Sequence, residues 1–90
     1  MMSSQLETHI GILTLIRGGV DIPSRIIYSS NVAWKPLLQM LKLFIAQGLI
    51  EERSVIGGNE ISYSITRKGD NVLRYLNGTK ILMELVSPVF

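Results

Sequence analysis

The sequence predicts a single small α+β domain that is mainly helical, and three observations lead to this prediction. Apolar residues recur at helical spacing in several stretches, a glycine-rich turn joins two strand-like segments, and the 90-residue chain has no internal repeat. A chain of this length holds one hydrophobic core, and its 47% hydrophobic content is high for so small a monomer. We therefore expect one domain over residues 1–90, with part of its apolar surface covered by a second copy.

The first helix is predicted from about residue 5 to residue 17. Ser4 and Glu7 have the spacing of a capping box, in which the Ser4 hydroxyl accepts a hydrogen bond from the Glu7 amide. Gly18 and Gly19 end the helix. Its apolar positions are Leu6, Ile10, Ile12, Leu13, Leu15 and Ile16. They cover more than half of the helix circumference, so we expect the helix to contact two surfaces.

Two short helices follow, joined by about four residues. Residues 20–22 have the composition of a short strand, and Pro23 favours the first turn of a helix that ends near Ser30. The next helix is predicted from about residue 33 to residue 47, because Pro36 is tolerated only in a first turn. Its inward stripe is Leu37, Met40, Leu41, Phe44 and Ile45. This spacing is typical of a helix-turn-helix.

After Gly48, which ends that helix, the pattern changes to that of strands. Residues 49–55 and 61–65 are predicted to form a hairpin whose turn is Gly57-Gly58-Asn59. A two-stranded ribbon is only marginally stable by itself. We therefore expect its apolar face to lie on the helices; this face consists of Ile61, Tyr63 and Ile65.

A fourth helix is expected after the hairpin, with Thr66 as its N-cap. The pair Asn77-Gly78 is predicted to interrupt or end this helix, and a helical apolar pattern resumes over residues 81–86. We assign residues 79–87 as a C-terminal dimerisation segment. The resulting order of elements is that of a winged helix-turn-helix, with a three-helix core, a β-hairpin wing and a C-terminal helix.

The charges of the chain are unevenly distributed. The net charge is +2, but residues 22–42 contain Arg25, Lys35 and Lys42 and no acid, which gives that segment +3. Residues 1–21 carry −1, residues 43–65 carry −2, and residues 66–90 carry +2. A surface that meets phosphates needs such an acid-free cluster, because each cation near a phosphate releases condensed counterions.

Lys35, Gln39 and Lys42 are spaced four and three residues apart, so they share one face of the predicted helix over residues 33–47. A helix in the major groove of DNA presents such a face to base edges and phosphates, and glutamine pairs well with adenine. The alternative is a solvated helix face. Trp34 is expected either to pack on the DNA backbone or a thymine methyl group, or to be a half-buried anchor of the core.

The predicted wing offers fewer contacts to DNA. Arg53 and Asn59 are its candidate contact residues, together with the glycine amides of the turn. Three acids lie nearby and would repel phosphate: Glu51, Glu52 and Glu60. The alternative is an ordinary surface hairpin without a role in binding.

Several classes of function lack the residues that they require. The chain has no cysteine and one histidine, His9, which we expect to be exposed, so disulfides, iron–sulfur clusters and thiolate zinc sites are excluded. No serine is placed with a base and an acid as in a hydrolase triad, and no phosphate-binding loop is present. We expect no enzyme activity, metal, cofactor or small-molecule ligand. Without a signal peptide or a membrane span, we expect a soluble cytoplasmic protein.

The segment from Arg25 to Gly69 resembles the small archaeal winged helix-turn-helix transcriptional regulators, chromosomal and viral. The matching residues are Arg25, Ile26, Ile27, Tyr28, Asn31, Val32, Trp34, Lys35, Leu37, Leu41, residues 48–51 and residues 63–69. The sequence QGLIEE before the wing and YSITRKG after it are the more specific parts. Ala33 stands at a cap where such proteins typically have serine or threonine.

This resemblance implies a homodimer that binds specific sequences of double-stranded DNA and regulates transcription. The DNA-binding candidates are Arg25, Asn31, Trp34, Lys35, Gln39, Lys42, Arg53 and Asn59. The alternative is a winged-helix module that docks onto protein and does not bind DNA, and a third possibility is a non-specific architectural DNA binder.

The predicted dimer interface combines the first helix with the C-terminal segment. Its candidate residues are Leu6, Ile12, Leu15, Ile81, Leu82, Leu85 and Val86. Left uncovered, they would form a large apolar patch on a monomer. A two-fold interface buries that patch and presents two recognition helices to half-sites about 34 Å apart. The alternative is that the C-terminal segment folds back over its own core.

Overall fold

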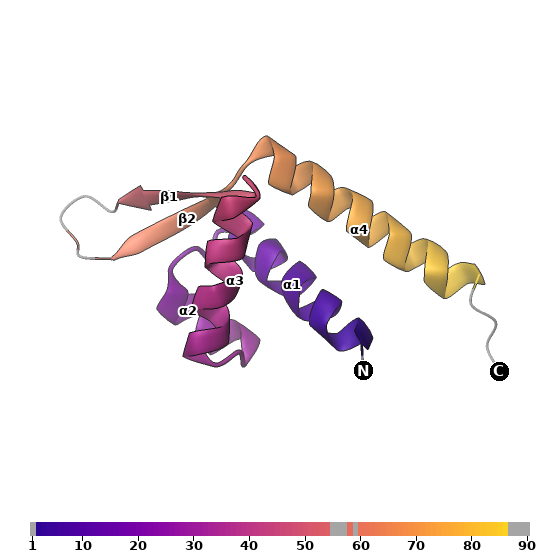
Figure 1. The fold of residues 1–90 in the computed structure, drawn as a ribbon, viewed down its shortest axis with the longest axis horizontal. Helices are drawn as coiled ribbons and strands as arrows, with labels where there is room; N and C mark the ends of the chain where they lie inside the picture. The colour runs from indigo at the N-terminus through magenta and orange to yellow at the C-terminus, as the bar shows by residue number, and fades with distance from the viewer. Residues whose placement is uncertain (1, 55–57, 59, 87–90) are drawn as a thin grey trace.

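Six elements appear in the predicted order in the computed structural model. The structure describes the backbone of residues 2–54, 58 and 60–86, and the side chains of residues 5–54, 58 and 60–78. The elements are α1 (Met2–Arg17), α2 (Pro23–Ser30), α3 (Trp34–Ala46), β1 (Ile50–Ser54), β2 (Ile61–Ile65) and α4 (Arg67–Val86) (Figure 1). The mainly helical α+β prediction is confirmed. Residues 20–22 form no strand; the Asp21 carbonyl accepts one hydrogen bond from the Tyr63 amide, at 2.9 Å.

Helix α1 begins earlier than predicted and ends as predicted. It begins at Met2, so Ser4 lies inside the helix and is not its N-cap. Gly19 has a φ of +99°, a left-handed conformation that glycine adopts without strain. The Gly19 amide donates to Ile16 at 3.1 Å and the Val20 amide donates to Leu15 at 2.9 Å. These two hydrogen bonds form a Schellman motif, which satisfies carbonyls at the end of the helix.

The core lies between the three N-terminal helices, the start of the hairpin and the first half of α4. Its most completely buried side chains are Ile12, Leu13, Ile26, Leu37, Leu41 and Leu73. Helix α1 packs against α2, α4 and β2, which confirms the expectation that it contacts more than one surface. Ile12 is only 1% exposed, so the prediction that it belongs to an apolar patch left uncovered on a monomer is wrong. Its apolar side chain is already covered within one chain.

Helix α3 is held at both ends as its sequence predicts. Ala33 precedes it with extended backbone angles, and Pro36 lies in the first turn, where its missing N–H breaks no helical hydrogen bond. Gly48, with a φ of +73°, follows the helix. The Gly48 amide donates to Ile45 and the Leu49 amide donates to Phe44, at 2.9 and 2.8 Å. The chain turns back here and buries Leu49 in the core.

The hairpin packs on the helices only at its base. Strands β1 and β2 are antiparallel, with Ile50 opposite Ile65 and Ser54 opposite Ile61. Tyr63 is buried and Ile65 is half-buried, but Ile61 is exposed, which contradicts the expectation that all three lie on the helices. Ile61 pairs with Ser54 at the end of the ladder opposite the base. The ribbon extends away from the helices (Figure 1). The turn residues Gly57 and Asn59 lie outside the described residues.

Thr66 joins the end of α3 to the start of α4. The Thr66 Oγ1 accepts a hydrogen bond from the Gly69 amide at 2.9 Å, which confirms it as the N-cap of α4. The same hydroxyl lies 2.7 Å from the Gly48 carbonyl oxygen and 3.0 Å from that of Leu49, and donates toward them. The Thr66 amide also donates to Leu49, at 3.0 Å. One residue therefore ties α4 to the turn that follows α3.

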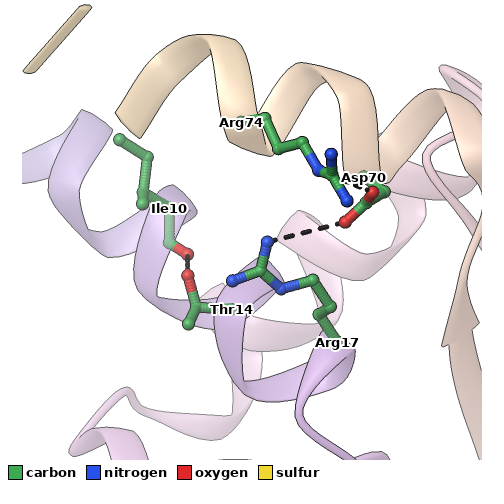
Figure 2. Close-up of polar contacts among 5 residues, drawn as sticks. All are labelled: Ile10, Thr14, Arg17, Asp70 and Arg74. Atoms are coloured by element: carbon green, nitrogen blue, oxygen red, sulfur yellow. Dashed lines mark hydrogen bonds and ion pairs between the residues drawn. The ribbon is translucent and has the colours of Figure 1, made fainter. Parts of the chain in front are cut away.

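Helix α4 runs without interruption through Asn77 and Gly78 to Val86, so the predicted break at this pair is wrong. Figure 2 shows Asp70 of α4 beside two guanidinium groups. Its carboxylate lies 3.5 Å from Arg17 of α1 and 3.0 Å from Arg74 one turn later. The pair with Arg17 joins α4 to α1 and the pair with Arg74 lies within α4; at partly exposed positions each contributes less than about 1 kcal/mol.

The molecule is elongated because two elements extend from the core. Its radius of gyration is 14.3 Å, compared with about 12 Å for a compact domain of this length. The hairpin extends on one side and the second half of α4 extends on the other, past the body formed by α1, α2 and α3 (Figure 1). The exposed side of α3 lies on this body.

Candidate nucleic-acid interface

The core packing of α3 determines which of its faces is exposed. Leu37, Leu41 and Phe44 are all buried on the inner side of the helix. Lys35, Gln39 and Lys42 are all exposed. Because the two sets are interleaved at helical spacing, the polar side chains lie opposite the core and point together into solvent. The spacing argument from the sequence therefore identified the outer face of this helix.

Apolar side chains border this polar face. Trp34 is 53% exposed, so it is not the half-buried core anchor that was one of its two expected roles. Leu43 is 45% exposed, and Leu38 is half-buried. Ile45 is exposed, so its assignment to the inward stripe is wrong. It lies one residue after buried Phe44, and the rotation of about 100° per residue carries it past the edge of the buried stripe.

Helix α2 adds the predicted cation Arg25 and an aromatic side chain, Tyr28, that the sequence reasoning missed. Arg25 is exposed, as expected for a residue that meets DNA. Tyr28 is 91% exposed. It lies two residues after buried Ile26, which places it about 200° around the helix. That spacing is the signal in the sequence that could have identified Tyr28 as an outward-facing residue with a phenolic hydroxyl.

Asn31 has a structural role at the turn between α2 and α3. Its φ is +60°, a left-handed conformation that asparagine tolerates better than most residues. Its amide donates to the Ile27 carbonyl at 3.2 Å and so closes the last turn of α2. Its side chain is exposed and remains a candidate for DNA contact. The conformation of the turn explains the residue type without any such contact.

In the wing, a hydrogen bond between the two strands fixes the side chain of Arg53. The Arg53 Nε donates to the Ser64 Oγ at 2.9 Å, and the Ser62 Oγ donates to the Arg53 carbonyl at 3.2 Å. Glu51 and Glu52 are exposed on the same strand. Asn59, the other candidate in the wing, lies outside the described residues. Among the candidates, the structure thus gathers Lys35, Gln39 and Lys42 on one face and leaves Arg53 on a separate, acidic element.

Comparison with known proteins identifies the family of this fold. A sequence model described as winged helix-turn-helix matches residues 3–84. The chain belongs to the winged helix-turn-helix family. No curated protein sequence matches it significantly. The fold class predicted from the sequence is confirmed.

Two solved structures share this winged-helix fold with low sequence identity. Wild-type MarR from Escherichia coli, in its apo form, superposes with a TM-score of 0.76 at 17% identity, over 91% of this chain and 64% of that one. ZitR from Lactococcus lactis, a zinc-responsive member of the MarR family, superposes with a TM-score of 0.69 at 20% identity, over 87% of this chain and 58% of that one. This winged helix thus spans about three-fifths of the length of these two proteins.

The candidate dimer residues of the winged helix differ in their accessibility. Leu6 is 49% exposed, Leu15 is half-buried and Ile12 is buried. An open groove of about 570 Å³ lies between α1 and the turn from α2 to α3, and Ile12, Leu15 and Val32 contribute to its lining. Ile81, Leu82, Leu85 and Val86 belong to α4, but their side chains lie outside those that the structure describes.

His9 is half-buried, which corrects the expectation of an exposed helical histidine. Its ring lies 5.7 Å from that of Phe44, at an interplanar angle of 74°, so the two pack edge to face. Within the described residues, no group of three or more histidine or acidic side chains is placed to hold a metal ion. No helix in the described part of the chain is long and apolar enough to cross a membrane.

Proposed function

We propose that this chain is a sequence-specific regulator of transcription that binds double-stranded DNA with α3 in the major groove. The observation that carries the proposal is the exposed face of Lys35, Gln39 and Lys42, which lies on a segment without acidic residues. The winged helix-turn-helix family of the chain and its resemblance to archaeal regulators support the same reading. The proposal assigns binding, and no catalysis, to this domain.

In the proposed complex, each candidate residue has a role that its chemistry permits. Lys35 and Lys42 neutralise phosphates or meet guanine, and Gln39 pairs with a base edge. Arg25 and Tyr28, both exposed on α2, meet the phosphate backbone next to the groove. The wing contributes Arg53 alone among its described residues, because Glu51, Glu52 and Glu60 repel phosphate.

A docking module for another protein is the second candidate function. The exposed apolar side chains of Trp34, Leu43 and Ile45, which border the polar face of α3, favour it. A net charge of +2 is also low for a protein that binds DNA mainly through phosphates. The two candidates differ in their response to salt.

Fluorescence anisotropy with a labelled mixed-sequence duplex, measured over a series of salt concentrations, tests the proposal. We expect binding whose log K falls linearly with log salt, with a slope of about −0.9 for each phosphate contact. The double variant Lys35→Ala with Lys42→Ala should reduce the magnitude of this slope by about 2.

Arg74→Ala is the matched control, because it removes a cation from the exposed side of α4 and should leave the slope unchanged. Absence of binding to any duplex at low salt would overturn the proposal in favour of protein docking.

We further propose that the regulator is a homodimer. Exposed Leu6, the groove beside Leu15 and the second half of α4, which extends past the core, together offer a surface for a second copy. In such a dimer, the two-fold axis places two copies of α3 for successive half-sites. Light scattering should then give about twice 10.0 kDa. A mass of one chain at high concentration contradicts the dimer.

Two finer expectations belong to the same proposal. The resemblance over residues 25–69 favours an archaeal or archaeal viral source. A regulator of transcription in such a cell acts in the cytoplasm, where the DNA lies. Detection of the protein in the cytoplasmic fraction of its host tests this location.

A further inference from the structure

We propose that α3 selects A·T base pairs, and that Leu43 recognises the methyl group of thymine. This inference rests on the proposed function, since it concerns the bases that the same face of α3 meets in the major groove. It follows from which side chains lie on that face, how they are spaced, and which chemistry they lack.

The exposed side of α3 carries one amide side chain, which is suited to paired hydrogen bonds with a base. Gln39 presents an amide that matches N6 and N7 of adenine. The acid partner typical of cytosine is absent, because residues 22–50 contain no aspartate or glutamate. Arginine is absent from α3, and its two lysines, which can also pair guanine, are assigned here to phosphates. The polar chemistry of this face therefore favours adenine.

Leu43 lies next to Gln39 on this face. The two residues are four apart, so they are neighbours on the helix surface and differ by about 6 Å along its axis. Base pairs are stacked at about 3.4 Å, so this distance spans roughly two base-pair steps. Leu43 is 45% exposed, which leaves its apolar carbons available to a partner.

Thymine offers the apolar group that Leu43 requires. In the major groove, guanine, cytosine and adenine present polar donors and acceptors, and only thymine adds a methyl group. An apolar side chain pressed against a polar base edge or a phosphate removes water without replacing its hydrogen bonds, which costs free energy. In the proposed complex, Lys35 and Lys42 bind the phosphates that border the major groove. Leu43 lies on the same helix and therefore enters the groove.

Replacement of thymine by uracil tests this inference directly. Uracil lacks the methyl group but keeps the base-pairing edge and the minor groove unchanged, so an effect of groove width does not alter the comparison. Anisotropy is measured with three duplexes of equal length and charge: one of mixed A·T and T·A pairs, its uracil counterpart, and one of G·C pairs. We expect the thymine duplex to bind more tightly than the G·C duplex, and about fourfold more tightly than the uracil duplex for each contacted methyl group.

Two variants separate the methyl contact from general binding. Leu43→Ala should weaken binding to the thymine duplex, leave binding to the uracil duplex unchanged, and bring the ratio of the two affinities close to one. Lys42→Ala is the matched control: it should weaken binding to both duplexes by the same factor and leave that ratio as in the wild type. Alanine is a good helix former, so neither change disturbs α3.

The possible failures have different meanings. Salt-dependent binding that is equal for all three duplexes would overturn this inference and leave the proposed function standing. The inference would also be overturned if Leu43→Ala kept the wild-type ratio of affinities for the thymine and uracil duplexes. The methyl contact would then belong to another residue. If no duplex binds, the proposed function itself fails, and the apolar border of α3 belongs to a protein partner.

Discussion

At the scale of single residues, equal spacing in the sequence does not mean equal burial. Ile61, Tyr63 and Ile65 alternate on one side of β2, yet only Tyr63 is buried and Ile61 is exposed. The alternation predicts which side chains share a face, but how far the core reaches along the strand depends on where the helices end. That distance is set by the packing of separate elements, which periodicity does not contain.

The ionisation of Tyr63 predicts how stability depends on alkaline pH. Burial raises the pKa of the Tyr63 hydroxyl above its usual 10.0, and the nearby charge of Glu52 adds to the effect. The folded state therefore retains the Tyr63 proton over a pH range in which the unfolded chain has lost it. This contribution to stability is fully present below pH 10 and is lost as the pH rises through the folded-state value.

Urea unfolding of the wild type and of Tyr63→Phe, measured between pH 7 and pH 11, checks this prediction. The free energy of unfolding of the wild type should fall more steeply above pH 10 than that of the variant. Parallel curves would contradict a raised pKa for Tyr63.

The candidate site was predictable where one helix carries it. Lys35, Gln39 and Lys42 follow from helical spacing because a single buried stripe defines the outer face of α3. Tyr28 and the turn conformation of Asn31 were missed: the spacing of Tyr28 after Ile26 was a usable signal that was not applied, whereas a backbone dihedral has no periodic signal. The relative positions of α2, α3 and the wing depend on tertiary packing.

At the scale of elements, glycine in this chain has opposite meanings at different positions. Gly19 and Gly48 each follow the end of a helix in a left-handed conformation, which a helix cannot continue through. The sequence predicted both of these helix ends. Gly78 was predicted to break α4 but lies within it. A helical glycine costs about 1 kcal/mol relative to alanine, and a helix with enough support continues through it. The sequence pattern alone does not reveal that support.

Gly69 and Gly78, both in α4, provide a matched pair of substitutions. In Gly69→Ala the new Cβ would collide with the Leu49 carbonyl oxygen and lie 2.8 Å from Ile65 Cγ1. Because a backbone atom cannot give way easily, we expect a loss of at least about 2 kcal/mol in the free energy of unfolding. Gly78→Ala meets no atom within 4 Å and should raise that free energy by about 0.5–1 kcal/mol.

Urea unfolding monitored by circular dichroism measures both variants. If Gly69→Ala were as stable as the wild type, the close approach of α4 to the end of α3 would be incorrect. If Gly78→Ala were destabilising, residue 78 would not be helical in solution.

At the scale of the whole molecule, the elongated shape is the feature that a second copy would explain. The first half of α4 packs on α1 and buries Leu73, but α4 continues well past that contact. For a homodimer, the urea midpoint of unfolding should increase with total protein concentration, since association stabilises only the folded chain. Each tenfold increase should add about 1.4 kcal/mol to the apparent stability. A midpoint that stays constant over a hundredfold range would contradict the dimer.

The hydroxyl of Thr66 has a consequence for the slow motions of the native state. The Thr66, Gly69 and Leu49 amides are all bonded within the junction that this residue makes between α3 and α4. None of them reaches solvent until the junction opens, so amide hydrogen exchange at all three positions should share one opening free energy. Opening of the first turn of α4 would therefore also release the turn that follows α3, and opening of that turn would release the start of α4.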